Sequence, residues 1–474
     1  MIVKNHQFLT LAKITNYFLW LLFLTNLLCL VIFAPNIPEW RYGDLLKING
    51  FTVLIWTVVS FFSAVVNSYG KKYLNGFRYH NTFLMLCLGF TSSIMIFVMA
   101  NNVFLLLSMW LAMGIFMSRL IGVDRDWAEA RAAAQFALKY FVAGSIFLSV
   151  GVLLLAYQAN DYTLTGIINK VNNLPQYISL IAALCIITAA IIQSAIYPFH
   201  RWLLSAMTAP TPASALMHAG FVNGSGILLT LFSTVLFASN SLIILLIIGG
   251  LTAIIAQFTK LLQVNVKQKL ACSTIAQMGF MIMQCGLGFF NAAVVHLILH
   301  GFYKAYLFLS AGEEIGLSKP QTPSNIKIKP FQAIIVLFFG VLGAVLFAFL
   351  TGKGLALNSG LFLILIIAIT VGQVTYNIVK EQSLTVVQKA FLPSLLFVVG
   401  IVVYAFLYNE ITAIMGDMPM IDLPIALSSI EVGFGILFLT GFFVMKLGIY
   451  RNFPWLYVKL LNISQPYKKT VFNK

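Results

Sequence analysis

Three ionisable side chains recur at every fourth residue of one apolar stretch. The segment from Phe290 to Ser310 carries His296, His300 and Lys304. Four residues advance about 400° around an α-helix and about 6 Å along its axis, so the three side chains follow one helix face. Imidazole and amine groups both take up and release protons, and this spacing suits groups that pass a proton along. We call these three residues the His/Lys stripe and expect it to act as a proton relay.

The stripe residues also have ordinary structural explanations. A lysine near the end of a membrane helix extends its amine to the water interface, and a single histidine in an apolar helix is often a hydrogen-bonded core residue. Lys304 lies well inside its apolar stretch, however, and shares a face with both histidines. A lysine at the bilayer centre costs about 2.5–3.5 kcal/mol on insertion scales and usually faces a bundle interior or a water-filled path. The shared face favours the ion path.

A second stretch combines helix-breaking prolines with small and polar residues. Its prolines are Pro198, Pro210 and Pro212. Proline removes a backbone donor, and the freed carbonyls are tolerated inside a membrane only where protein or a cavity satisfies them. Broken helices often line transport sites, although a proline-rich turn between two ordinary spans explains the same residues. His218 follows on the next predicted helix, and we expect it to face the His/Lys stripe.

Three further side chains are candidates for a secondary part of the path. Gln193 and Ser214 belong to the proline-containing stretch, and Lys353 lies in a loop that we expect on the outer side. Amide, hydroxyl and amine groups hold and orient hydrogen-bonded partners, which is what a path for ions needs.

The composition indicates that membrane helices position these residues. The chain has 474 residues, of which 60% are hydrophobic and 9% charged, and its mean hydropathy is +0.95. Soluble domains have about 25% charged residues, so an ordinary soluble domain is excluded. A helix needs about 20 mostly apolar residues to cross a bilayer, and we count about fourteen such runs. They are residues 15–34, 51–66, 82–100, 103–120, 139–157, 176–197, 213–238, 242–259, 272–290, 292–311, 331–350, 359–379, 392–408 and 429–447.

We therefore expect an all-α polytopic membrane protein. The first run lacks a small-x-small cleavage pattern, so we take it as a retained span. The chain divides into four parts, which are N-terminal helices at 1–80, a translocating core at 81–380, C-terminal helices at 381–447 and a basic tail at 448–474.

The basic residues predict the orientation of the chain. Lys and Arg number 29 against 13 Asp and Glu, for a net charge of +16. Of the 29, 24 fall in segments that share the side of the N-terminus. Cytoplasmic loops carry the excess of Lys and Arg, so we expect both termini in the cytoplasm and the protein in the inner membrane. The basic inner surface suits anionic lipid or a docked partner, whereas its dispersal among apolar runs excludes a nucleic-acid binder.

The sequence predicts no metal site or catalytic site of its own. The five cysteines fall singly in apolar runs, without spacing for zinc or for a disulfide framework. No stretch remains for a soluble catalytic domain, and we expect no cofactor in this chain.

Three ordered motifs resemble the proton-pumping, antiporter-like membrane subunits of NADH–quinone oxidoreductase and of multisubunit cation/proton antiporters. They read AMTAPTPASALMHAG at 206–220, KQKLACSTIAQMGFM at 267–281 and HLILHGFYKAYLFLSAG at 296–312. The resemblance implies discontinuous helices in two inverted repeats. It also implies that Lys304 is the central proton-carrying lysine and that His218, His296 and His300 are the connecting histidines.

Two departures separate this chain from the pumping subunits. Those subunits have a glutamate after a tryptophan on an early helix and a lysine before the Ser-Ala of the proline-containing stretch. Here Leu111 follows Trp110, and Gln193 precedes Ser194. Both members of a buried ion pair are thus replaced together. Replacing only one of them would leave the other charge buried without a partner. We also expect no long lateral helix after the last span.

With these two departures, the chain most resembles the membrane subunits of two-component DAB-type inorganic-carbon transporters. That resemblance implies a cytoplasmic zinc-dependent partner similar to a β-carbonic anhydrase, docked on the basic inner face. The membrane subunit would pass protons or sodium ions inward while its partner hydrates CO2 to bicarbonate. Two alternatives remain. The chain could serve a respiratory or cation/proton antiporter complex, or it could be a scaffold with a vestigial stripe.

Overall fold

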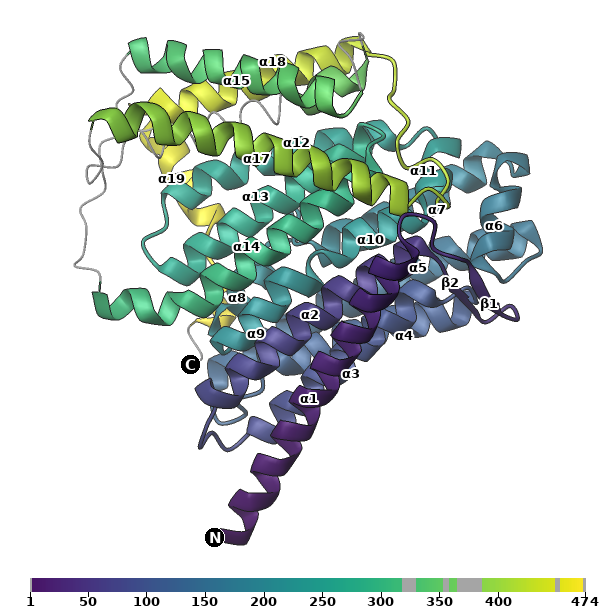
Figure 1. Ribbon diagram of the computed structural model, residues 1–474, viewed down its shortest axis with the longest axis vertical. Helices are drawn as coiled ribbons and strands as arrows, with labels where there is room; N and C mark the ends of the chain where they lie inside the picture. The colour runs from purple at the N-terminus through teal and green to yellow at the C-terminus, as the bar shows by residue number, and fades with distance from the viewer. Residues whose placement is uncertain (1, 318–329, 353–357, 365–385, 448–451, 472–474) are drawn as a thin grey trace.

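The described part of the chain is almost entirely helical. The structure is a computed structural model and describes residues 2–317, 330–352, 358–364, 386–447 and 452–471. Long helices lie side by side in one bundle (Figure 1). The predicted all-helical membrane class is confirmed, with one small exception near the N-terminus.

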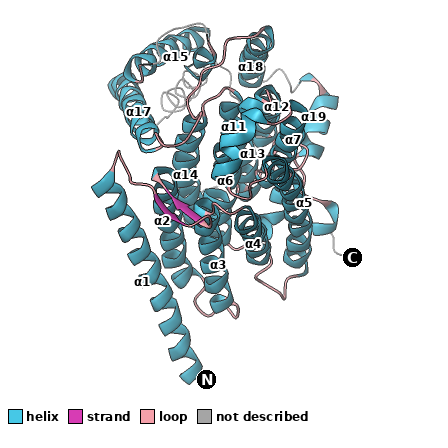
Figure 2. Cartoon of the chain, turned by 90° about the vertical axis from the view of Figure 1, so that its right-hand side faces the viewer, coloured by secondary structure: helices cyan, strands magenta, loops and turns pink. Residues whose placement is uncertain are grey.

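The exception is a short hairpin between the first two helices. Helix α1 (Ile2–Phe33) lies beside α2 (Gly50–Tyr73), and β1 (Trp40–Tyr42) pairs antiparallel with β2 (Leu46–Ile48) between them. Figure 2 shows α1 along the edge of the bundle. The all-α expectation missed this hairpin because strands of three residues are too short to show an alternating pattern.

The next helices form the first half of the core. They are α3 (His80–Met99), α4 (Val103–Ile121), α5 (Ala128–Ala159), α6 (Leu164–Lys170), η1 (Val171–Asn173) and α7 (Gln176–Gln193). The Asn102 side chain accepts hydrogen bonds from the backbone amides of Phe104 and Leu105, which caps the first turn of α4. α5 packs against both α4 and α7.

The proline-containing stretch interrupts the next helix several times. Its pieces are α8 (Arg201–Ser205), η2 (Ala206–Thr208), α9 (Thr211–Leu216), η3 (Met217–Phe221), α10 (Gly224–Leu231) and α11 (Ser233–Ala238). Pro212 stands in the first turn of α9, where a missing N–H costs nothing, and η3 is a π-helical turn. The predicted break is present, and its π-helical turn carries His218.

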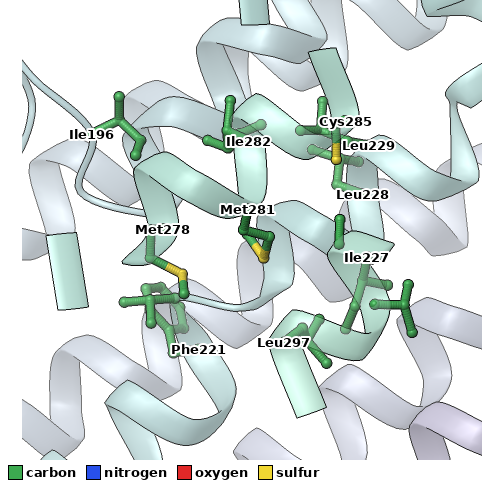
Figure 3. Packing of buried hydrophobic residues seen from close by; sticks show 14 of the residues in the cluster. Ile196, Phe221, Ile227, Leu228, Leu229, Met278, Met281, Ile282, Cys285 and Leu297 are labelled. Atoms are coloured by element: carbon green, nitrogen blue, oxygen red, sulfur yellow. The ribbon is translucent and has the colours of Figure 1, made fainter. Parts of the chain in front are cut away.

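Three helices close around this break. α12 (Leu242–Leu261) and α13 (Val266–Gly286) pack tightly together, and α14 (Phe290–Leu317) contacts α13, α10, α9 and η3. Asn265 caps the start of α13 by accepting from the amides of Lys267 and Gln268. Figure 3 shows apolar side chains of α10, α13 and α14 in one buried cluster, including Ile227, Met281 and Leu297.

The C-terminal helices complete the bundle. They are α15 (Pro330–Leu350), α17 (Val386–Ile414), α18 (Ser429–Leu447), α19 (Pro454–Ile463) and η5 (Lys468–Thr470). α15 lies beside α17, as Figure 2 shows, and α18 and α19 both contact α12.

The described helices include ten that are long and apolar enough to cross a membrane, and two shorter apolar helices at Val341–Leu350 and Ser429–Gly441. Most of the run predicted at 272–290 lies in helix α13 (Val266–Gly286), which is not among those ten. Most of the run at 359–379 lies outside the described residues. The chain is therefore multi-pass, while the total of fourteen spans, the inverted repeats and the sidedness stay predictions.

Candidate ion pathway

The His/Lys stripe lies on the buried face of α14. Lys304 has 0% and His300 5% of its surface exposed, although neighbouring Tyr303 is 57% exposed toward the outside of the bundle. The rings of His296 and His300 have centroids 6.0 Å apart with planes tilted by 32°. The spacing predicted from helix geometry thus places three ionisable groups in succession along one interior line.

Lys304 is buried with a backbone partner in place of a counter-charge. Its Nζ donates to the carbonyl oxygen of Leu270 on α13 at 2.9 Å. None of the ion pairs found among the described residues includes Lys304. An amine with one weak acceptor is poorly compensated in its charged form, which is the condition under which a lysine can release its proton.

His218 reaches the stripe from the broken helix. It is fully buried, and its ring stacks on Phe308 of α14 with centroids 4.4 Å apart and planes 15° apart. Phe308 lies one turn beyond Lys304. His218 and His300 both interact electrostatically with Lys304. The structure therefore brings His218 to the place where we expected a partner on another helix.

His218 and the two histidines of the stripe have buried ring nitrogens that lack a protein partner. Both ring nitrogens of His218 and the Nε2 atoms of His296 and His300 are buried without a hydrogen-bond partner among the described residues. Buried polar atoms are normally satisfied by protein or by ordered water. Unsatisfied imidazole nitrogens along one line are therefore the expected neighbours of mobile water and protons.

The secondary candidates lie at different places. Gln193 is buried, and its Nε2 donates to the carbonyl of Phe221 at 3.3 Å, at the end of η3. Ser214 is fully buried, and its hydroxyl donates to the carbonyl of Ala209 at 3.4 Å, so it satisfies the helix break. Lys353 lies outside the described residues. The structure thus gives Gln193 and Ser214 roles in holding the break.

Three polar residues near the stripe escaped the sequence analysis. Lys260, which we counted in an inner loop, lies in the last turn of α12 and interacts electrostatically with Lys304. Lys267 donates to the freed carbonyl of Ala209 at 3.0 Å. Asn223 donates to the carbonyl of Leu297 at 3.2 Å, which ties the break to α14. Lys260 directly follows the predicted run at 242–259, and that position could have suggested a half-buried amine.

The α8 end of the break is held by the C-terminal tail, of which residues 452–471 are described. The Nε2 of His200 donates to the carbonyl of Ile463 at 2.8 Å, because only the ring can supply the hydrogen. The amide of Tyr467 donates to the Ser205 hydroxyl at 3.0 Å, and Gln263 donates to the hydroxyl of Ser464 at 2.7 Å. The tail therefore docks on the segment between the predicted spans.

We expect this docking to weaken in mild acid. Burial lowers the pKa of His200 to about 4, whereas an unfolded histidine titrates near about 6.5. As pH falls, His200 therefore binds a proton at a higher pH when the tail is undocked than when it is docked. Its contribution to the stability of the docked tail is complete above about pH 6.5 and is lost as pH falls toward 4. Hydrogen exchange in α19, corrected for its intrinsic pH dependence, should rise over this interval. A His200→Gln variant should keep the tail docked without that pH dependence; an identical pH profile in both proteins would contradict this role.

The described residues contain no group of three His, Cys, Asp or Glu side chains that could hold a metal ion. All five cysteines are free, and Cys285 lies in the apolar cluster of Figure 3. The ionisable groups that gather in the interior are lysines and histidines, and both can take up and release protons.

Comparison with known proteins shows where this arrangement recurs. Residues 100–376 match the family described as NADH:quinone oxidoreductase/Mrp antiporter, transmembrane region. The fold resembles a chain in the structure of an Mrp complex from Dietzia sp. DQ12-45-1b, with a TM-score of 0.64 and 21% identity over 95% of this chain and 56% of that one.

Curated relatives include two kinds of membrane subunit. A probable inorganic carbon transporter subunit DabB of Bacillus anthracis is 35% identical over 69% of this chain and 64% of its own length. Its counterpart in Bacillus subtilis is 33% identical over 62% of this chain and 57% of its own length. An NADH-ubiquinone oxidoreductase chain 5 of Podospora anserina is 29% identical over 65% of this chain and 48% of its own length. Each match covers less than two thirds of the relative.

Proposed function

Because the chain belongs to the NADH:quinone oxidoreductase/Mrp antiporter transmembrane family, we propose that it is the ion-translocating membrane subunit of a two-component inorganic-carbon uptake complex. Protons or sodium ions would move inward through it, and a zinc-containing, carbonic-anhydrase-like partner on the cytoplasmic face would hydrate CO2 to bicarbonate. The observation that carries the ion role is Lys304, fully buried, bonded to one backbone carbonyl and aligned with two histidines. The carbon role rests on the similarity to the inorganic carbon transporter subunits.

The chain's own residues suit a relay between the two membrane sides. A proton arriving at His296 would pass to His300, since the rings follow each other at a centroid distance of 6.0 Å. Lys304 would take the proton next and hold it as an ammonium on the Leu270 carbonyl. Its release toward the inner ends of α12 and α13 would then be assisted by the nearby positive charge of Lys260. His218 would provide a side branch to the broken helix.

The sidedness and the organisation of the chain form part of the proposal. With both termini in the cytoplasm, the basic inner loops and the tail would face anionic lipid and the docked partner. The division at residues 80, 380 and 447 and the fourteen spans are proposed from the sequence pattern, and the inverted repeats from the resemblance to the antiporter-like subunits. The zinc and the catalytic site are assigned to the partner, and this chain supplies the ion step only.

Co-expression tests the proposal. The tagged chain, isolated from its own cells, should carry a zinc-containing partner similar to a carbonic anhydrase. Together they should restore growth in air to bacteria that lack carbonic anhydrase, and an uncoupler should abolish that growth. The partner expressed alone is the matched control and should not rescue. Rescue that persists in full with uncoupler present would contradict an ion-driven function.

The similarity to NADH-ubiquinone oxidoreductase chain 5 supports a second candidate, a subunit of a respiratory or antiporter complex. That candidate requires co-purification with flavin or iron–sulfur subunits, or with several small antiporter subunits. The replacement of the pumping subunits' glutamate and lysine by Leu111 and Gln193 favours the carbon transporter. In the scaffold alternative, partner binding and carbon uptake would survive joint replacement of His218 and the His/Lys stripe.

A further inference from the structure

A second group of polar side chains lies at the other end of α14 from Lys304. Asn291, in the first turn of α14, donates from Nδ2 to the hydroxyls of Tyr408 and Thr412, each at 2.8 Å. The Tyr408 hydroxyl in turn donates to Oδ2 of Asp422 at 3.2 Å. We call these four residues the outer polar cluster. α14, α17 and the loop at 415–428 each contribute to it.

The outer polar cluster extends from fully buried side chains to a half-buried side chain in a loop. Asn291 is 0% exposed and Tyr408 2%, whereas Asp422 is half-buried in the loop. The charge distribution assigns this loop to the outer side of the membrane. A buried hydroxyl is therefore hydrogen bonded to a carboxylate at the predicted outer surface.

The loop that carries Asp422 is fixed to the start of α14. The amides of Phe290 and Asn291 donate to the carbonyl of Ile421 at 2.9 and 3.2 Å, and the amide of Leu423 donates to the carbonyl of Gly288 at 3.2 Å. Gly288 has a φ of +87°, and a Cβ there would collide with the Leu423 carbonyl. Asp422 is thereby held at the N-terminus of a long helix, where the helix dipole favours a carboxylate.

The outer polar cluster and the His/Lys stripe share helix α14. His296 is the stripe residue nearest to Asn291 and follows it by five residues, which corresponds to about 7.5 Å along the helix axis and about 140° around it. The Nε2 of His296 is buried and has no hydrogen-bond partner among the described residues. In the proposed path, ordered waters that pass around this part of α14 would join the cluster to His296.

We propose that Asp422 and Tyr408 form the outer mouth of the proton path, with Asn291 as a positioning residue for the tyrosine hydroxyl. The inference rests on the proposed ion-translocating function and adds to it the residues that exchange protons with the outside. It also specifies the transported ion as a proton.

Each transfer at this mouth conserves protons. A proton from the outer medium adds to the carboxylate of Asp422. The resulting carboxylic O–H bond breaks as its proton passes to the Tyr408 oxygen, while the hydroxyl proton of Tyr408 leaves to a water on the His296 side. For this to happen, the Tyr408 hydroxyl first rotates from the protonated carboxyl toward the water, and the proton that it then receives from Asp422 restores the hydrogen bond to the carboxylate. Neither side chain changes its charge over the cycle, and one proton moves inward.

Proton flux into vesicles tests this mouth. The full chain with its co-purified partner is reconstituted, a potassium gradient with valinomycin imposes an inward potential in sodium-free buffer, and a trapped dye reports internal pH. Asp422→Asn and Tyr408→Phe should each lower the flux by about tenfold or more, because each removes an exchangeable proton. Asp422→Glu should recover most of the flux. Glu410→Gln changes an exposed acid near the same end of α17 and should conduct like the unaltered protein.

The possible outcomes distinguish a failure of the proposed outer mouth from a failure of the proposed ion-translocating function. If Lys304→Ala stops the flux but Asp422→Asn and Tyr408→Phe conduct normally, the proposed mouth is wrong and the ion-translocating function stands. If Lys304→Ala conducts normally, the proposed function itself is wrong. A purely structural role for Asp422 predicts lower thermal stability in Asp422→Asn and no recovery of flux in Asp422→Glu. A flux that requires sodium would overturn the proton path.

Discussion

Replacing Lys304 with alanine should abolish the growth in air that the complex restores to cells without carbonic anhydrase. The variant protein should still insert into the membrane and bind the proposed partner. The variant removes the fully buried amine that bonds to Leu270, and with it the group that we propose takes a proton from His300. General acid–base groups contribute about 100-fold or more to the proton transfers they mediate, so residual activity should be close to background. The measurement is growth in air of cells that lack carbonic anhydrase, together with the amount of complex in the membrane.

The variant Lys304→Arg shows whether proton release or positive charge matters at this site, and Lys170→Ala serves as its control. Lys304→Arg keeps the charge but carries a guanidinium that does not deprotonate in proteins, so it should be as inactive as Lys304→Ala. Lys170→Ala removes a lysine from a surface ion pair with Asp161 and should grow normally, because such pairs contribute about 0–1 kcal/mol. Full activity in Lys304→Arg would show that the charge is needed and the proton transfer is not.

A side chain added at Gly279 should destabilise the protein strongly. The backbones of α12 and α13 cross here, and a Cβ at Gly279 would lie 2.7 Å from both the Ala253 nitrogen and the Gly249 oxygen. Backbone atoms cannot move aside as side chains do, so Gly279→Ala should separate the helices at a cost of about 1–3 kcal/mol. The bulkier Gly279→Val should prevent accumulation of the protein in the membrane.

The expected consequence is a lower melting temperature in detergent. Gly400→Ala provides the matched control because a Cβ there meets nothing within 4 Å, and alanine favours a helix more than glycine does. Since α13 also supplies the Leu270 carbonyl to Lys304, the surviving Gly279→Ala protein should conduct more slowly. Unchanged melting in Gly279→Ala would show that the two helices tolerate greater separation.

Much of the core of the candidate site follows from periodicity alone. The four-residue spacing of His296, His300 and Lys304 is sufficient to predict a common face, because any α-helix places such residues together. The prolines likewise predict a broken helix, since they cannot donate within one. These features are local, and a local pattern is visible in the sequence.

The remaining features depend on contacts between distant segments. No pattern near Asp422 indicates that its loop caps α14, or that Tyr408 from another helix donates to it. Lys260 was counted as a loop residue because a helix end in sequence does not show its depth in the bundle. The docking of the tail on His200 joins residues more than 250 positions apart, so it too required the structure.

If ion flow through Lys304 drives carbon uptake, ion flux and bicarbonate accumulation must change together in the same vesicles. Vesicles that contain the complex are given CO2 and a graded inward ion gradient, while internal bicarbonate and ion flux are followed at the same time. We expect bicarbonate accumulation to rise with the flux, to fall to the equilibrium level at zero gradient and to stay there in Lys304→Ala at every gradient. Accumulation above equilibrium without a gradient, or in the Lys304→Ala complex, would contradict ion-driven uptake through Lys304.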